Sequence, residues 1–239
     1  MNRLINYYYE IRYRCLKAYW LCYSKFSNVH GLVLMYHHVS DQHFDTNDSC
    51  QHTISEFKKG IESLKEMGYR FVSISEALDI MRNKNDEKFA VVTFDDVSDD
   101  VYCNAYPILK HNNIPFTLFV TTNFINKVGF LSKYQLLEMD KDNLCTIGAH
   151  TVSHPMLRYS DNISYELKHS KNILEELLGH KVDYLAYPYG RQSSVSRKVQ
   201  IIAKKSGYKC AFGTIQTPIS DVSEKNMFYL PRVVLKNNF

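Results

Sequence analysis

The sequence lacks the features of several large protein classes. Its 239 residues include 9 glycines, 6 prolines and 1 tryptophan, without internal repeats or a linker rich in proline or glycine. No glycine-rich phosphate loop follows any apolar run, so a nucleotide-binding fold has little support. With 45% hydrophobic and 23% charged residues, the composition is that of a globular chain that can bury a core. One domain of ordinary size is the simplest organisation.

The six cysteines form no C-x-x-C pair. This scatter argues against a disulfide framework. Cys103, Cys145 and Cys210 fall inside apolar segments. The pattern therefore predicts buried free thiols in a reducing compartment.

The formal net charge of +4 is too small to indicate a nucleic-acid partner. Residues 1–26 carry five basic residues and one acidic residue, so this aromatic stretch alone accounts for the net charge. Its uncharged run at 18–24 is too short for a secretory leader or a membrane span. We expect a cytoplasmic protein whose basic aromatic N-terminal helix either packs on the domain or a partner subunit, or makes peripheral contact with the inner face of the membrane.

Apolar runs alternate with helical periodicities along the rest of the chain. Strands are predicted at 31–39, 69–75, 88–94, 114–120, 144–150, 182–188, 208–214 and 227–235. Helices are predicted at 53–68, 75–83, 163–179 and 195–207, with another around Pro107. This alternation favours a parallel α/β fold, and a (β/α) barrel over an open sheet. We expect a helix at 1–28 and one barrel domain at 29–239.

Polar side chains stand at the ends of the predicted strands, where parallel α/β folds place their functional groups. Asp95 and Asp96 follow the run at 88–94, and His150 ends the run at 144–150, with His154 four residues later. Two histidines four residues apart share one face of a helical turn and can bind one metal ion. With one carboxylate they form a facial triad that leaves positions open for water and substrate. The cation would let the second aspartate stay ionised as a general base.

A non-catalytic interpretation of the aspartates is a helix N-cap pair. Asp99 and Asp100, slightly further along the chain, fit the cap interpretation better.

Three short segments, in order, carry a family resemblance. "TFDD" (93–96), "HTVSH" (150–154) and "YPYG" (187–190) resemble the polysaccharide deacetylase family, carbohydrate esterase family 4. The similarity is densest over 89–213 and extends over 31–235. It implies a distorted (β/α) barrel that binds a divalent metal, usually zinc. It also implies an enzyme that removes acetyl groups from N-acetylated sugars.

The resemblance also implies roles for individual residues. Asp95 corresponds to the catalytic base, and Asp96, His150 and His154 correspond to the metal ligands. The backbone N–H of Tyr189 would help to hold the oxyanion.

The sequence departs from the family pattern at three places. Val97 stands where the family has a glycine, and Ala186 stands where it has the arginine that pairs with the base. Arg232 is our candidate for that cation, with Arg191 as a second choice. The motif that supplies the general acid is missing, and His37 is either its replacement or an ordinary hydrogen-bonded histidine at a strand end.

We therefore expect a metal-dependent N-deacetylase that acts on an N-acetylated glycan, or its sugar-linked precursor, in assembly of a bacterial surface glycan. One alternative is a carbohydrate-binding or scaffold protein that keeps the barrel without turnover. Another is an amidase for a non-sugar amide. Retention of Asp95 favours an enzyme, because a metal site that only binds needs no second carboxylate beside its ligand.

Overall fold

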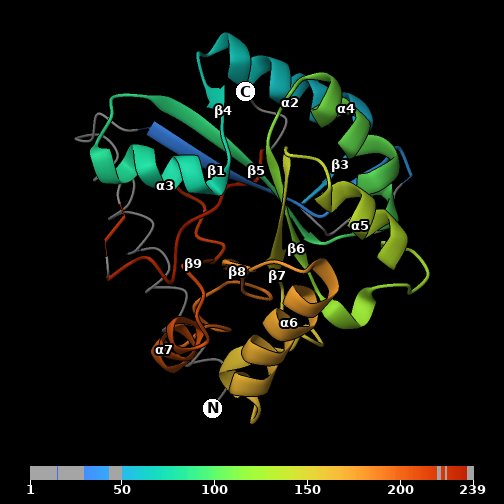
Figure 1. Ribbon diagram of the computed structural model, residues 1–239. Helices are drawn as coiled ribbons and strands as arrows, with labels where there is room; N and C mark the ends of the chain where they lie inside the picture. The colour runs from blue at the N-terminus through green and yellow to red at the C-terminus, as the bar shows by residue number, and fades with distance from the viewer. Residues whose placement is uncertain (1–14, 16–29, 43–49, 220–221, 224, 236–239) are drawn as a thin grey trace.

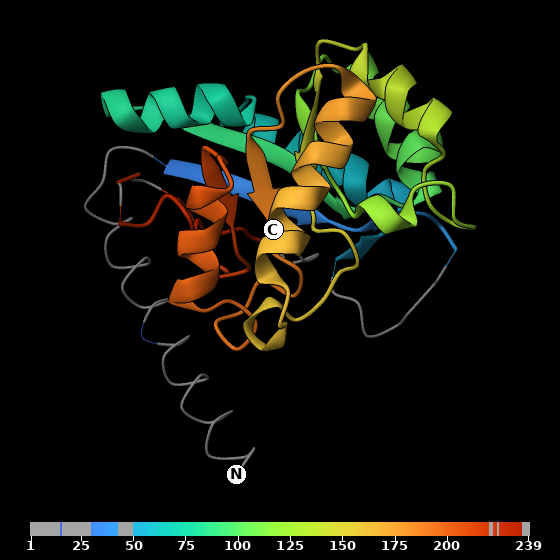
Figure 2. The same cartoon turned by 60° about the horizontal axis from the view of Figure 1, so that its bottom comes forward.

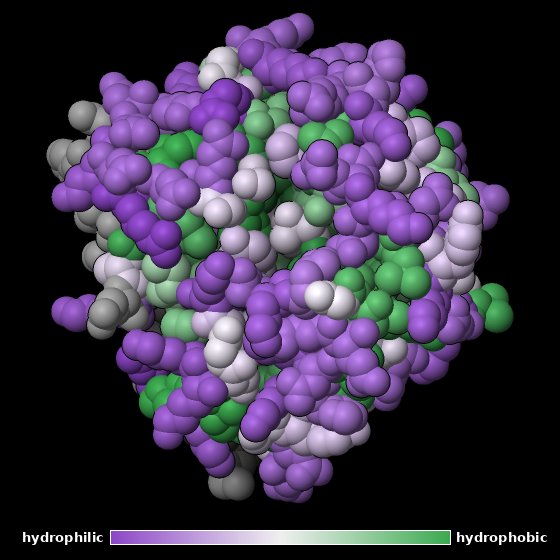
Figure 3. Space-filling view, in the orientation of Figure 1, coloured by the Kyte–Doolittle hydropathy of each residue, from purple (hydrophilic) through white to green (hydrophobic). Residues whose placement is uncertain are grey.

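The computed structural model describes residues 15, 30–42, 50–219, 222–223 and 225–235 (Figure 1). The predicted helix at 1–28 therefore lies outside the described residues, apart from Cys15, and it stays a prediction. None of the helices within the described ranges is long and apolar enough to cross a membrane. The face seen in Figure 3 is mostly hydrophilic, with hydrophobic side chains in small patches.

A parallel sheet forms the centre of the fold, in the order β1–β5–β6–β7–β8–β9, with β4 also paired to β5. The strands are β1 (His30–Tyr36), β4 (Arg70–Phe71), β5 (Lys88–Asp96), β6 (Phe116–Val120), β7 (Cys145–Ala149), β8 (Tyr184–Ala186) and β9 (Cys210–Phe212). A separate parallel pair joins β2 (His38–Val39) to β3 (Gln51–His52). Strand β5 is buried along almost its whole length, as expected for a parallel strand covered on both faces.

A short C-terminal segment, residues 230–233, closes the sheet into a barrel. The Leu230 N–H donates to a carbonyl of β9 (2.9 Å), and the Val233 N–H donates to a carbonyl of β1 (2.8 Å). The predicted continuous strand at 227–235 is wrong, because the segment makes only isolated bridges to these two strands. Pro231 lies between the bridges and has no N–H to donate. The predicted distorted barrel is confirmed.

Helices surround the sheet on most sides (Figures 1 and 2). They are α2 (Ile54–Glu66), α3 (Ile74–Asn83), α4 (Tyr106–His111), α5 (Lys133–Asp140), α6 (Ile163–Leu178) and α7 (Arg197–Lys205), with a π-helical turn at Val101–Ala105 before α4. Helix α5 has no counterpart among the helices predicted from the sequence. Its signal was a capping box, in which Ser132 and Gln135 exchange side-chain and backbone hydrogen bonds at the helix start.

Two hydrophobic clusters occupy the two faces of the sheet. One contains Val91 of β5 together with Leu78 and Met81 of α3. The other contains Val92 of β5 together with buried side chains from most of the remaining helices. Because successive side chains of a strand alternate between faces, Val91 and Asp95 point to the same side of β5. Asp95 therefore continues the row of side chains that the first cluster begins.

The cysteine expectation is partly wrong. The five described cysteines are free, as predicted, and Cys210 is buried. Cys103 is exposed, because it lies in the turn before α4 with its side chain toward solvent, and Cys145 is half-buried.

Candidate metal centre and catalytic pocket

The end of β5 separates the two aspartates into different environments. Asp95 is 3% exposed, whereas the Asp96 side chain is 25% exposed. Asp96 and Val97 both have left-handed backbone, with φ of 59° and 62°. Such backbone costs a β-branched residue on the order of 1–3 kcal/mol. Val97 keeps this glycine-like conformation with its side chain packed in the core, so the missing glycine does not abolish the turn.

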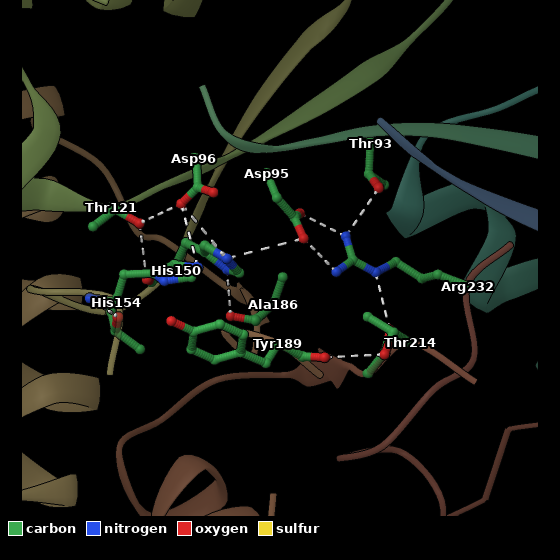
Figure 4. A network of polar contacts seen from close by, with 12 residues as sticks. Thr93, Asp95, Asp96, Thr121, His150, His154, Ala186, Tyr189, Thr214 and Arg232 are labelled. Carbon is green, nitrogen blue, oxygen red and sulfur yellow. Dashed lines mark hydrogen bonds and ion pairs between the residues drawn. The ribbon is translucent and has the colours of Figure 1, made fainter. Parts of the chain in front are cut away.

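Asp96, His150 and His154 come together at the carboxyl ends of β5 and β7 (Figure 4). Their candidate ligand atoms all lie within 4.8 Å of one another. The Nε2 atoms of His154 and His150 lie 3.5 Å and 3.9 Å from Asp96 Oδ1. His150 Nδ1 lies 2.8 Å from the Ala186 carbonyl oxygen. Since a carbonyl only accepts, Nδ1 carries the proton, and Nε2 is left as the ligand atom.

This donor set fits a zinc ion. Two imidazole nitrogens and one carboxylate oxygen are ordinary zinc ligands, and tetrahedral coordination at about 2.1 Å separates ligand atoms by about 3.4 Å. Burial lowers the pKa of His154 to about 4. The imidazole is therefore neutral near pH 7, which is the form that binds metal.

The two histidines do not share a helical turn, so that part of the prediction is wrong. Strand β7 ends at Ala149, and the chain then reverses through left-handed backbone at Thr151 (φ 72°) and His154 (φ 60°). This irregular turn, residues 150–154, brings both rings to one place, with centroids 5.1 Å apart.

Arg232 pairs with Asp95 from the opposite side (Figure 4). Its two terminal nitrogens donate to the two carboxylate oxygens, each at 2.6 Å, and the arginine is fully buried. Further bonds run to the Thr93 hydroxyl (3.2 Å) and the Gly213 carbonyl (3.1 Å), and the guanidinium lies 5.5 Å from the Phe119 ring centre. The predicted contact between Arg232 and Asp95 is confirmed, while its role in catalysis stays a prediction.

The Arg232 charge keeps Asp95 ionised. Burial alone would raise the pKa of this carboxyl group, but the charge of Arg232 and its two hydrogen bonds outweigh burial and lower the pKa to about 2. Arg191, the second candidate cation, is exposed at the pocket wall, and both Asp95 oxygens are already bonded to Arg232. The cation expected at position 186 thus comes from the segment that closes the barrel.

Tyr189 lies across the pocket from the aspartates. Its ring is half-exposed and sits 4.9 Å from the His154 ring, centre to centre. Its backbone is left-handed (φ 60°), and its carbonyl accepts from the Thr214 hydroxyl (3.2 Å). Within the described part of the chain, no group accepts a hydrogen bond from the Tyr189 N–H. That donor is therefore available to a bound oxygen.

His37 lines the same pocket, a cleft of about 760 Å³ that also contains Asp95 and Tyr189. This volume is in the usual range for small-molecule sites, about 300–1,000 Å³. The His37 backbone is fixed on both sides, because its N–H donates to the Cys50 carbonyl (3.1 Å) and its carbonyl accepts from the Ser98 hydroxyl (3.2 Å).

Two supporting residues were missed or misinterpreted from the sequence. Asp100 is not a side-chain cap. Its carboxylate contacts His38 Nδ1 (2.9 Å) and accepts from the Ser98 hydroxyl (2.6 Å), which ties β2 to the segment that follows β5. The buried Thr121 hydroxyl lies 3.1 Å from Asp96 Oδ1 and 3.2 Å from the His150 carbonyl oxygen. Its signal was a polar residue directly after the apolar run of β6.

A family model for polysaccharide deacetylases matches residues 82–211. The chain belongs to the polysaccharide deacetylase family. The poly-β-1,6-N-acetyl-D-glucosamine N-deacetylase of Staphylococcus aureus strain MRSA252 is 28% identical over 243 residues, covering 90% of this chain and 81% of that protein.

Solved structures of the family share the fold. The Streptococcus pyogenes deacetylase PplD in complex with acetate is 28% identical, with a TM-score of 0.77, over 87% of this chain and 93% of that one. IcaB from Ammonifex degensii is 26% identical, with a TM-score of 0.74, over the same shares of the two chains. The barrel with its irregular closure is therefore the polysaccharide deacetylase fold.

Proposed function

We propose that this protein is a zinc-dependent hydrolase that removes the N-acetyl group from a hexosamine of a bacterial surface glycan or of its sugar-linked precursor. One observation carries the proposal: two adjacent carboxylates in one pocket differ in their main partners. Asp95 is paired with Arg232, and Asp96 lies with His150 and His154. Family membership and the name of the S. aureus relative support an N-acetylated glycan as the substrate.

The pocket residues divide the chemistry of amide hydrolysis. When bound, the ion would polarise the amide carbonyl and lower the pKa of a nearby water molecule. Asp95 accepts a proton from that water as its oxygen adds to the carbonyl carbon. The Tyr189 N–H donates to the carbonyl oxygen as negative charge develops there. His37 donates a proton to the amide nitrogen as the C–N bond breaks, which releases acetate and a free amine.

The scaffold alternative loses its main support. It depended on the missing arginine and the missing general acid, and Arg232 provides the cation, while His37 as the acid stays a prediction. A buried, ionised Asp95 beside a metal site has a use in turnover and none in binding metal alone.

Metal analysis tests the ligand assignment. Purified protein should contain zinc or a similar divalent ion, and the His150→Ala/His154→Ala variant should lose most of it, because two of three protein ligands are removed. Full metal occupancy in the double variant would refute the site.

Acetate release tests the base. On a panel of N-acetylated glycans and nucleotide- or lipid-linked sugars, Asp95→Asn should keep its metal and lose about 10²-fold or more in kcat. Asp96→Ala should lose metal and activity together. An active Asp95→Asn variant would show that the two roles are wrongly assigned.

We also propose that the protein is cytoplasmic and that residues 1–26 contact the inner face of the membrane, on the basis of their basic aromatic sequence alone. Deletion of 1–26 should leave an active barrel that no longer floats with anionic vesicles. A full-length protein that never binds these vesicles at low salt would exclude the contact.

A further inference from the structure

Glu166, in the first turn of α6, holds the turn that carries both histidine ligands. The residue is only 7% exposed. Its Oε2 accepts from the backbone N–H groups of Val152 (2.9 Å) and Ser153 (3.0 Å), and its Oε1 accepts from the Ser153 hydroxyl (2.6 Å). Three donors of the 150–154 turn thus converge on one buried carboxylate from another element.

The charge of Glu166 is directed at this turn. Among the residues that the structure describes, no lysine, arginine or histidine forms an ion pair with it, whereas Glu175 on the same helix pairs with Lys171 and Lys181. Hydrogen bonds to a carboxylate are roughly twice as strong as those between neutral groups. A buried carboxylate that lacks a cation is therefore stabilised mainly by the turn, and it stabilises the turn in return.

The turn needs such support because its backbone is strained. Thr151 and His154 both have left-handed φ, and Thr151 is β-branched. Conformations of this kind persist only where surrounding contacts fix them. The other fixed points are the Thr151 hydroxyl, which accepts from the His154 N–H (3.1 Å), and backbone bonds from Thr122 and Asn123. Glu166 fixes the backbone of Val152 and Ser153, which lie between these contacts and immediately before His154.

We propose that Glu166 is a positioning residue that sets the affinity of the metal site by fixing the direction of the His154 ring. It contacts neither ligand ring, so it acts through the backbone of the turn. Without it, His154 can turn away from Asp96, whereas His150 stays fixed by its bond to the Ala186 carbonyl. The inference depends on the proposed metal site and adds a residue outside the three family segments.

Zinc affinity in a chelator-competition assay tests this directly. Glu166→Gln keeps the size of the side chain, but its amide group replaces one acceptor with a donor that faces other donors. The zinc dissociation constant should rise about tenfold, the lower end of the effect of residues that orient ligands. The absorption bands of cobalt-substituted protein should shift as well, because a change in the direction of the His154 ring changes the ligand field at the ion. Glu176→Gln, an exposed position on the same helix, is the matched control and should change neither value.

Ser153→Ala keeps the test decisive if Glu166→Gln does not fold. It removes only the 2.6 Å bond to Oε1, so the zinc dissociation constant should rise about threefold. An unchanged dissociation constant in whichever of these variants folds, with or without lower stability of the metal-free protein, would overturn the proposal. If the wild-type protein itself binds no divalent ion, the proposed metal site fails instead, which is a separate outcome.

Discussion

Replacing Arg232 by methionine removes the cation from a buried ion pair and keeps an unbranched apolar side chain of similar length. Asp95 then remains 3% exposed without the two bonds that now satisfy its oxygens. The Gly213 carbonyl and the Thr93 hydroxyl lose a partner as well.

The expected loss of stability is large. Removing one partner of a buried pair costs about 3–5 kcal/mol, because the other charge is left uncompensated. A domain near the middle of the usual range of stability, about 10 kcal/mol, would keep about 5–7 kcal/mol and remain folded at low urea. Adding Asp95→Asn to the variant removes the stranded charge. The double variant should therefore be more stable than Arg232→Met alone, by about 1–3 kcal/mol.

Urea unfolding of metal-free protein, with both single variants and the double variant, measures this coupling. Arg70→Met is the matched control, since Arg70 pairs with Glu76 and Glu87 at the surface with 49% of its side chain exposed. It should cost less than about 1 kcal/mol. Strict additivity of Arg232→Met and Asp95→Asn would refute the buried pair.

Three further predictions concern the acid, an ion-pair cluster and a glycine. His37→Gln should lower deacetylation of an amide by about 10²-fold but leave hydrolysis of an activated acetate ester nearly unchanged, because that leaving group needs no proton; equal losses on both substrates would exclude the acid role. Burial would raise the pKa of Glu175, but the Val182 N–H, Lys171 and Lys181 lower it from 4.5 to about 2. Its stabilising contribution is therefore present above about pH 5 and is lost as pH falls towards 2. Glu175→Gln should cost about 1–3 kcal/mol at pH 7 and progressively less in acid, and a difference independent of pH in urea unfolding would contradict this. A Cβ on Gly148 would lie 2.6 Å from the Phe119 ring, so Gly148→Ala should destabilise by about 1–3 kcal/mol in the same assay. Gly60→Ala is the control, because Gly60 lies in helix α2 and its Cβ would come no closer than 3.3 Å to another atom, Leu235 Cδ1. It should not destabilise; equal losses would remove the steric reason.

Local sequence patterns predicted most of the sheet and the strongly periodic helices. Strand β5 was found because a long apolar run is typical of a strand buried on both faces. Helix α6 was found because its leucines recur on one side and Gly179 ends it. Helix α5 was missed because it is short and its apolar residues do not all lie on one face: Leu136 and Met139 are buried, whereas Tyr134 is exposed.

The candidate site likewise contains residues that the sequence predicts and residues that only the structure reveals. The proposed ligands and the proposed base stand in short motifs that can be recognised one segment at a time. The residues that support them cannot, because their roles arise from contacts between distant segments. Asp100 looks like a helix cap in the sequence, yet it contacts His38 across 62 residues. Glu166 looks like an ordinary first-turn acid, and only the packing of α6 against the 150–154 turn reveals its partners.

Closure of the barrel by residues 230–233 has a consequence for the order of folding. Arg232 meets Asp95 across 137 residues, in the same stretch that joins β9 to β1. Contacts so distant in the chain form late, because a large loop must be closed first. An intermediate with an open barrel would already hold the aspartates and histidines, but Asp95 would have no counter-charge. Enzyme activity during refolding should therefore recover with the slowest phase, after the sheet and the metal site have formed.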